Sequence, residues 1–171
     1  RIYLAYQYYH ADSAYVYAQK SFEVAQQMNS NLYMALAKCN LAFIYAMAGD
    51  NMQAFQEVAD LDSNYMPLWL KIEYFKTMQR LWGERTYTYL SNNLDKNKFI
   101  EKANEYVDSL AAITKPYTTD WYRYNTSKLE RQDNVDRLIA FVNKALAHEK
   151  DKHVRAGYYC TQAWDKKKKG D

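Results

Sequence analysis

Two histidines near the C-terminal end, His148 and His153, are the first candidates for metal chemistry in this sequence. They stand in the hexapeptide "HEKDKH", in which a glutamate follows the first histidine. The helix motif of zinc proteases needs two histidines four residues apart, so that both face the metal. Five positions at about 100° each place the two rings about 140° apart, on different helix faces. We therefore expect no metal site here, and no motif for any other cofactor is present.

Nucleophile and phosphate motifs are missing from the sequence as well. With four glycines in 171 residues, the chain has no glycine-rich phosphate loop and no G-x-S-x-G elbow. Ser13 follows Asp12, but "DSA" is typical of a helix start. Glu101 and Glu105 share a helix face with lysines between them, which is the pattern of a solvated surface. We therefore predict that this chain is not an enzyme.

Cysteine and charge patterns point away from redox, nucleic-acid and membrane functions. Cys39 and Cys160 match no metal or redox spacing, so we expect two buried free thiols and no disulfide between them. The net charge is +3, and the one dense basic run is "DKKKK", residues 165–169. A solvated helix end explains this run, so we expect no nucleic-acid binding through this region. No stretch of 18 apolar residues is present, so none should span a membrane.

Tyrosine is the unusual residue, with 18 copies in the chain. Two interpretations stay open. The tyrosines fill seams between helices with their hydroxyls reaching water, or some form a partly exposed aromatic surface for a peptide, a glycan or a partner protein. The candidates for such a surface are Tyr8, Tyr9, Trp121, Tyr122 and Tyr124.

The elements that must position these residues are all helical. Residues 32–48 carry two apolar faces, one with Leu36, Cys39 and Phe43 and one with Leu41 and Ile44. A helix with two apolar faces must be covered on both sides. Gly49 supplies the left-handed residue that ends helices, and the following "DN" can cap a second helix over residues 52–61. The sequence therefore predicts an antiparallel helix hairpin.

Further helices are predicted along the rest of the chain. Pro67 opens a helix over residues 67–90, with Gly83 as a candidate break. Residues 98–113 form another, which ends before Pro116. Thr118 or Thr119 caps a helix that reaches residue 131, and Asn134 caps the next one. With few turn residues, four Gly and two Pro, the chain is predicted to be all-α, with about seven to nine helices.

The hairpin resembles the tetratricopeptide repeat, an α-α superhelix of stacked antiparallel helix pairs. The matching positions in "LAFIYAMAGDNMQAFQEV" are Leu41, Ala42, Tyr45, Gly49, Ala54 and Val58. The resemblance implies that Ala42 and Ala54 lie where the two helices cross closely. Lys38 stands where the family has a tryptophan. The clearest repeat covers residues 32–61, partial and irregular repeats cover 1–28 and 152–171, and we expect one domain over 1–171.

The order of motifs over nearly all 171 residues is similar to a narrower group, the uncharacterised tetratricopeptide-like regulators of Bacteroidetes. In that group a signal peptide and helical repeats precede a membrane span and a cytoplasmic region. The resemblance implies a fragment of a longer chain, a non-enzymatic interaction or sensor module on the periplasmic side of a membrane-anchored protein. The alternatives are a cytoplasmic scaffold that binds a partner peptide and a glycan-binding outer-membrane lipoprotein.

The tetratricopeptide register also predicts which surface is closed. It places Leu36, Cys39, Phe43, Ala46 and Met47 on the concave face where such proteins hold peptides. An apolar face of this size left in water is rare in soluble monomers. We therefore predict that a helix from residues 67–113 covers this face, so that a partner binds elsewhere.

Overall fold

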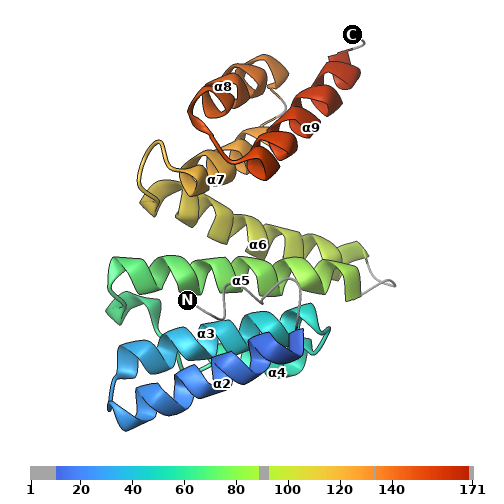
Figure 1. The fold of residues 1–171 in the computed structure, drawn as a ribbon. Coiled ribbons are helices and arrows are strands. Elements are labelled where there is room, and N and C mark those ends of the chain that lie inside the picture. Colours follow the sequence, from blue (N-terminus) through green and yellow to red (C-terminus); the bar gives the residue numbers. More distant parts are fainter. Residues whose placement is uncertain (1–10, 89–92, 133, 170–171) are drawn as a thin grey trace. The chain divides into compact units, whose positions relative to one another are not determined.

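The structure is a computed structural model that describes residues 11–88, 93–132 and 134–169, and the described residues form helices without any strand (Figure 1). This confirms the predicted all-α class. The helices are α2 (Ala11–Gln27), α3 (Asn31–Met47), α4 (Asn51–Val58), a 3-10 helix (Ser63–Tyr65), α5 (Leu68–Thr88), α6 (Asn93–Ile113), α7 (Thr119–Glu130), α8 (Val135–His148) and α9 (Lys152–Lys169).

The chain divides into two compact units, which we call unit 1 (Arg1–Tyr106) and unit 2 (Val107–Asp171). The border falls inside α6, so this helix contributes residues to both. Each unit has its own cluster of buried side chains. The single domain over residues 1–171 stays a prediction.

The predicted hairpin is present as α3 and α4, and its turn explains the glycine. Gly49 has a φ of 85°, a left-handed conformation that glycine adopts at low cost. The amide of Asp50 donates to the carbonyl of Tyr45, and the amide of Gly49 donates to that of Ala46. These two bonds form the Schellman motif that ends helices. The Asp50 carboxylate then accepts from the amide of Gln53 and caps α4.

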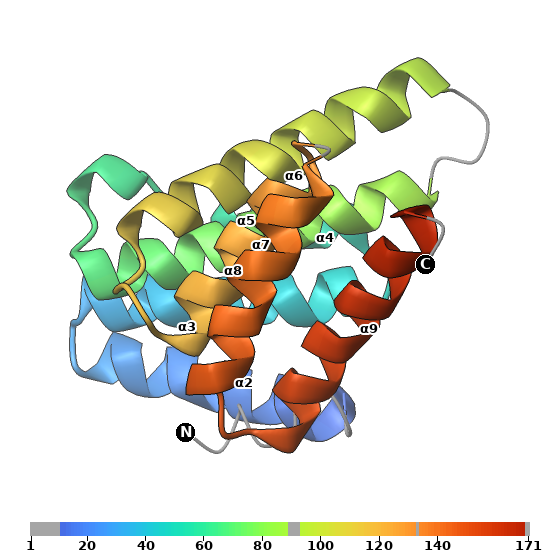
Figure 2. The same ribbon diagram turned by 90° about the horizontal axis from the view of Figure 1, so that it is seen from above.

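Both faces of α3 are covered, as its apolar pattern requires. On one side Leu41 and Ile44 pack with Ala14 and Ala18 of α2. On the other side lie α4 and α5, and Figures 1 and 2 show α3 between α2 and these helices. Ala42 and Ala54 are fully buried in one cluster. Alanine at both positions lets the helices approach closely because neither side chain extends beyond Cβ.

The second face of α3 is closed by α5, which confirms the prediction that a helix from residues 67–113 covers it. Cys39 and Ala46 are each 1% exposed and pack with Met78 and Leu81 of α5. Met47 lies at the edge of this cover, 42% exposed, with its sulfur 2.7 Å from the guanidinium of Arg80. The face that the register assigns to peptide binding is therefore core in this chain.

Lys38, the departure from the tetratricopeptide pattern, takes part in an ion pair. Its Nζ lies 2.5 Å from the carboxylate of Asp60, just beyond the C-terminal end of α4. The hydrogen bond from Lys38 lowers the pKa of Asp60. A cation that bridges the two helices of the hairpin thus stands where the family has an aromatic ring.

Several predicted boundaries are shifted. α4 ends at Val58 rather than residue 61, and the chain continues into the 3-10 helix that Asp62 caps. α6 begins at Asn93, five residues before the expected start at Lys98. α5 runs through Gly83 without a break. Asp12 lies within the first turn of α2 rather than before the helix.

Unit 2 is built on the two caps predicted from the sequence. The Thr118 hydroxyl accepts from the amide of Trp121 and starts α7, and the Asn134 side chain accepts from the amide of Arg137 and starts α8. The apolar faces of α7, α8 and α9 meet in a core of seven residues: Tyr122, Leu129, Leu138, Val142, Ala145, Leu146 and Tyr158. The Arg131 guanidinium also pairs with Asp108 of α6.

The two cysteines differ in exposure, which corrects the expectation that both are buried. Cys39 is enclosed by α5, whereas Cys160 in α9 is exposed. Burial raises the pKa of the Cys39 thiol from 9.0 to about 12. At neutral pH its reactive thiolate is therefore scarcer than that of an ordinary thiol.

We expect Ellman's reagent to titrate one thiol quickly in the folded chain and two after denaturation in urea. The Cys160→Ser variant should give no fast thiol until it is unfolded. The measurement is the absorbance of the released thiolate over time. Rapid reaction of both thiols in the native chain would show that α5 leaves the second face of α3 open.

Candidate functional site

The candidate aromatic surface is divided by the structure. Tyr8 and Tyr9 lie outside the described residues. Tyr122 and Tyr124 are buried, 4% and 7% exposed, which favours the seam interpretation for both of them. Tyr122 packs with side chains of α8 and α9 in the core of unit 2. Trp121 is half-buried and packs 5.5 Å from the ring of Phe141 in α8. Trp121 also borders a pocket.

Other tyrosines support the seam interpretation. The Tyr45 hydroxyl donates to that of Tyr15 at 3.3 Å between α3 and α2, and the two rings meet edge to face. The hydrogen bond that Tyr45 donates to Tyr15, and then burial, raise the pKa of Tyr45 to about 12. Burial raises the pKa of Tyr74 in α5 to about 12 as well. In Tyr122 and Tyr158, burial also raises the pKa.

These raised values predict a loss of stability at alkaline pH. Each folded-state pKa lies above the ordinary value of 10.0, so the neutral hydroxyl is the form that the fold stabilises. This contribution is complete below pH 10 and is lost as the pH rises from 10 toward 12. Urea unfolding should give a constant free energy at pH 8 and 9 and a falling one above pH 10. The Tyr74→Phe variant keeps the ring without the titrating hydroxyl, so its free energy of unfolding should fall less above pH 10 than that of the parent chain. An equal fall in both would contradict the assignment to Tyr74.

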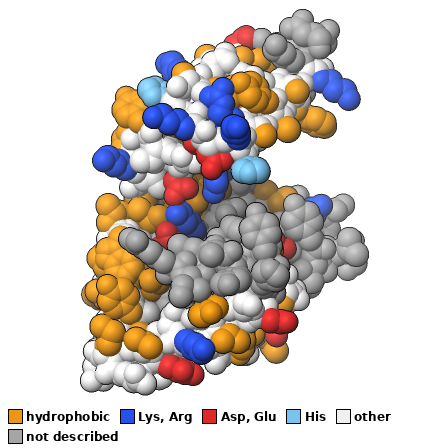
Figure 3. Space-filling view, in the orientation of Figure 1, with side chains coloured by type: hydrophobic (Ala, Val, Ile, Leu, Met, Phe, Trp, Pro, Cys, Tyr) orange, Lys and Arg blue, Asp and Glu red, His pale blue; other side chains and the backbone are white. Residues whose placement is uncertain are grey.

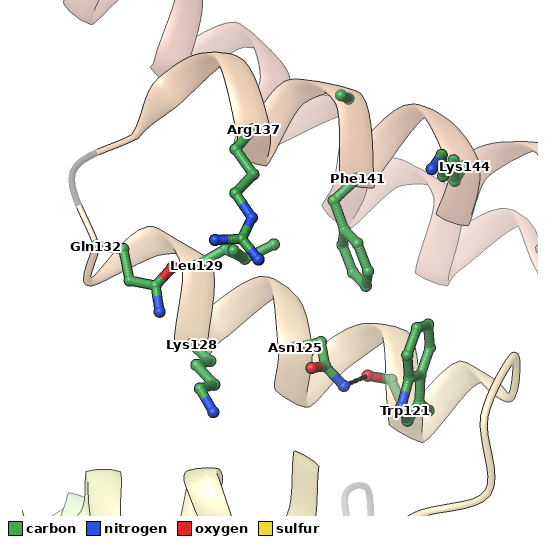
Figure 4. A pocket seen from close by; sticks show the side chains of 9 residues that line it. Trp121, Asn125, Lys128, Leu129, Gln132, Arg137, Phe141 and Lys144 are labelled. Carbon is green, nitrogen blue, oxygen red and sulfur yellow. Dashed lines mark hydrogen bonds between the residues drawn. The ribbon is translucent and has the colours of Figure 1, made fainter. Parts of the chain in front are cut away.

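A pocket of about 420 Å³ lies between α7 and α8. Its walls are formed by side chains at successive turns of each helix: Trp121, Asn125, Lys128, Leu129 and Gln132 from α7 and the residues after it, and Arg137, Ala140, Phe141 and Lys144 from α8. Figure 4 shows Arg137 and Phe141 extending from α8 toward α7, where Leu129 and Asn125 lie. The pocket has the size typical of small-molecule sites.

The charged side chains that line the pocket are all positive. Three cations, Lys128, Arg137 and Lys144, border the pocket together with Trp121 and Phe141, and no carboxylate lines it. Among the residues that the structure describes, none of the three cations forms an ion pair. The arrangement can therefore hold an apolar group against aromatic walls and an anion beside them.

Sequence reasoning missed the three cations and the exposed aromatics of unit 1. The cations follow the spacing of one helix face, Lys128 with Trp121 and Asn125 on α7 and Lys144 with Arg137 on α8, and this periodicity is the signal that was available. In unit 1 hydrophobic side chains gather over the connection between α4 and α5 (Figure 3). The exposed aromatic and aliphatic residues there are Tyr33, Tyr65, Leu68 and Trp69.

The described residues carry no feature of a metal site or of a membrane span. The described part of the chain holds no group of three His, Cys, Asp or Glu side chains placed to bind a metal ion. Among the described helices, none is both long and apolar enough to cross a membrane. The six repeat positions lie on the hairpin, with Leu41, Ala42, Ala54 and Val58 buried, Tyr45 half-buried and Gly49 in the turn.

A comparison with known families decides the relationship. The family model described as the SusR N-terminal TPR domain, where TPR is the tetratricopeptide repeat, matches residues 1–171. The chain belongs to the SusR N-terminal TPR domain family. The match confirms the tetratricopeptide-like fold and the resemblance to Bacteroidetes regulators. Comparison with curated proteins and with solved structures gives no match.

Within the SusR domain family match, the repeat pattern of this chain is clearest in the hairpin of α3 and α4. Within the described residues, α3 and α4 combine small residues at the helix crossing with a glycine turn. α5 covers the hairpin and also packs against α6, where the ring centroids of Phe75 and Tyr106 lie 5.5 Å apart. The chain is thus a helical-repeat module of the kind found in a Bacteroidetes regulator, with irregular repeats.

Proposed function

We propose that this chain is the sensor region of a membrane-anchored regulator, a non-enzymatic helical-repeat module that lies on the periplasmic side and binds a ligand or partner. The observation that carries the proposal is the match to the SusR N-terminal TPR domain over residues 1–171. An N-terminal repeat domain in a regulator is suited to receive a signal that another part of the protein transmits.

The geometry supports binding away from the inner face of the hairpin. That face is filled by α5, with Cys39 and Ala46 in the core. The pocket between α7 and α8 is open to solvent and carries uncompensated positive charge. The inner face of the hairpin, where tetratricopeptide proteins hold peptides, is therefore filled, whereas the pocket between α7 and α8 is open. This arrangement favours a ligand different from an extended peptide.

The exposed Cys160 offers a test of the periplasmic location. Living cells that produce the complete gene product are treated with a maleimide that crosses the outer membrane but not the inner one. Because Cys160 is exposed and Cys39 is buried, we expect Cys160 to be labelled in intact cells. Labelling is measured by mass spectrometry of the peptide that contains residue 160.

The Cys160→Ser variant is the matched control, because any label that it retains comes from another cysteine. Labelling of Cys160 that appears only after the inner membrane is broken would contradict the periplasmic location. That result would favour the alternative of a cytoplasmic scaffold.

A further inference from the structure

We infer that the pocket between α7 and α8 binds a small organic anion in which a carboxylate is joined to an aromatic or branched apolar group. The inference rests on the proposed sensor function and names the class of ligand that this sensor would take. The first reason is charge. Lys128, Arg137 and Lys144 border one pocket of about 420 Å³ without a lining carboxylate, and like charges gathered in this way favour an anionic partner.

The second reason is the spacing of charge and apolar surface on α8. Arg137 and Phe141 are four residues apart, so their side chains lie one above the other on the same face. Figure 4 shows both reaching toward α7. A guanidinium binds a carboxylate through two parallel hydrogen bonds. A ligand whose carboxylate lies within about 5 Å of its apolar group, the rise of one helical turn, can contact both side chains at once.

The third reason is the apolar wall that α7 and α8 form together. Trp121 packs 5.5 Å from Phe141, and the two rings with Leu129 offer an apolar surface beside the cations. An aromatic or branched group placed there leaves water and contacts these side chains. A small inorganic anion would use the cations and leave this wall uncovered.

The side-chain amide of Asn125 adds a specific hydrogen-bonding position. The Nδ2 of Asn125 donates to the carbonyl of Trp121 at 2.9 Å. This bond orients the side chain and leaves Oδ1 as an acceptor. An acylated amino acid supplies an N–H donor on the same carbon that carries its carboxylate and its side chain. N-acetyl-phenylalanine therefore combines the three groups that the pocket can recognise, and it serves as the probe.

The test compares three probes on the whole 171-residue chain by isothermal titration calorimetry. N-acetyl-phenylalanine has both the ring and the charge, N-acetyl-phenylalaninamide has the ring alone, and acetate has the charge alone. We expect the acid to bind about tenfold or more tightly than either of the others. No binding of the acid up to about 10 mM, or equal affinity for the acid and the amide, would overturn the inference.

Variants then locate the binding. Arg137→Gln should weaken the binding of the acid about tenfold and leave the binding of the amide unchanged. Arg137→Lys should weaken the binding of the acid less, because it keeps the positive charge at that position. Lys152→Gln, an exposed cation of α9 outside the pocket lining, is the matched control and should bind like the parent. An acid preference that persists in Arg137→Gln and in Lys144→Gln would place the anion elsewhere and overturn the inference.

A peptide probe separates two sources of the same chemistry. The tetrapeptide Gly-Gly-Gly-Phe presents the same terminal carboxylate and ring as part of a chain. Affinity similar to that of the acetylated amino acid supports the small ligand, whereas tenfold tighter binding of the peptide would overturn it in favour of a protein terminus. None of these outcomes depends on the labelling of Cys160, so failure of the ligand class and failure of the periplasmic location are distinguishable.

Discussion

Replacing Leu81 with alanine should lower the free energy of unfolding by about 2–5 kcal/mol. Leu81 is 0% exposed and packs with Cys39, Ala42 and Met78 in the cluster that joins α3 to α5. The substitution removes three carbon atoms and leaves a cavity whose rigid helical walls close only in part. Urea unfolding followed by circular dichroism measures the change.

Leu68→Ala is the matched control for this substitution. Leu68 stands in the same helix but is 58% exposed, so the same loss of atoms should cost far less. Equal losses in the two variants would contradict the assignment of Leu81 to the core and, with it, the cover of α5 over the hairpin.

Replacing Ala54 with leucine should destabilise the chain by about 1–3 kcal/mol through overpacking. Ala54 is 0% exposed and shares its cluster with Ala42 and Val58. No room remains for a larger side chain where α3 and α4 cross, so the helices must move apart or the leucine must adopt an unfavourable rotamer. Ala42→Leu should behave in the same way from the opposite helix.

Ala59→Leu provides the comparison for Ala54→Leu. Ala59 follows α4 directly and is exposed, so leucine there meets solvent. Thermal melts of Ala54→Leu and Ala59→Leu that coincide would show that the repeat register is wrong. A lower melting temperature for Ala54→Leu alone is the expected result.

The parts of the fold that were predictable from sequence depend on local chemistry. Gly49 and Asp50 define a turn because the left-handed conformation and the cap concern only neighbouring residues. Thr118 and Asn134 identify two helix starts for the same reason. The covered face of α3 was predictable because an apolar surface of that size must be buried, whichever helix covers it.

The features that were missed depend on how the helices pack on one another, which the local sequence pattern does not determine. The exposure of Cys160 follows from which side of α9 packs on α8, and helical periodicity alone does not choose that side. The candidate site was predicted only through Trp121, while Tyr122 and Tyr124 proved to be core. Arg137 and Lys144 could not be assigned to the same pocket before the pairing of α7 with α8 was known.

The closure of α3 by α5 has a consequence for the order in which the chain is made. On the ribosome α3 is complete at Met47, but its second cover ends only at Thr88, about forty residues later. Until then the newly made hairpin holds Cys39 and Ala46 on a face that α5 does not yet cover. Such transient apolar surface is what molecular chaperones recognise. The nascent chain is therefore most exposed to aggregation, and most in need of protection, in the interval between the synthesis of α3 and that of α5.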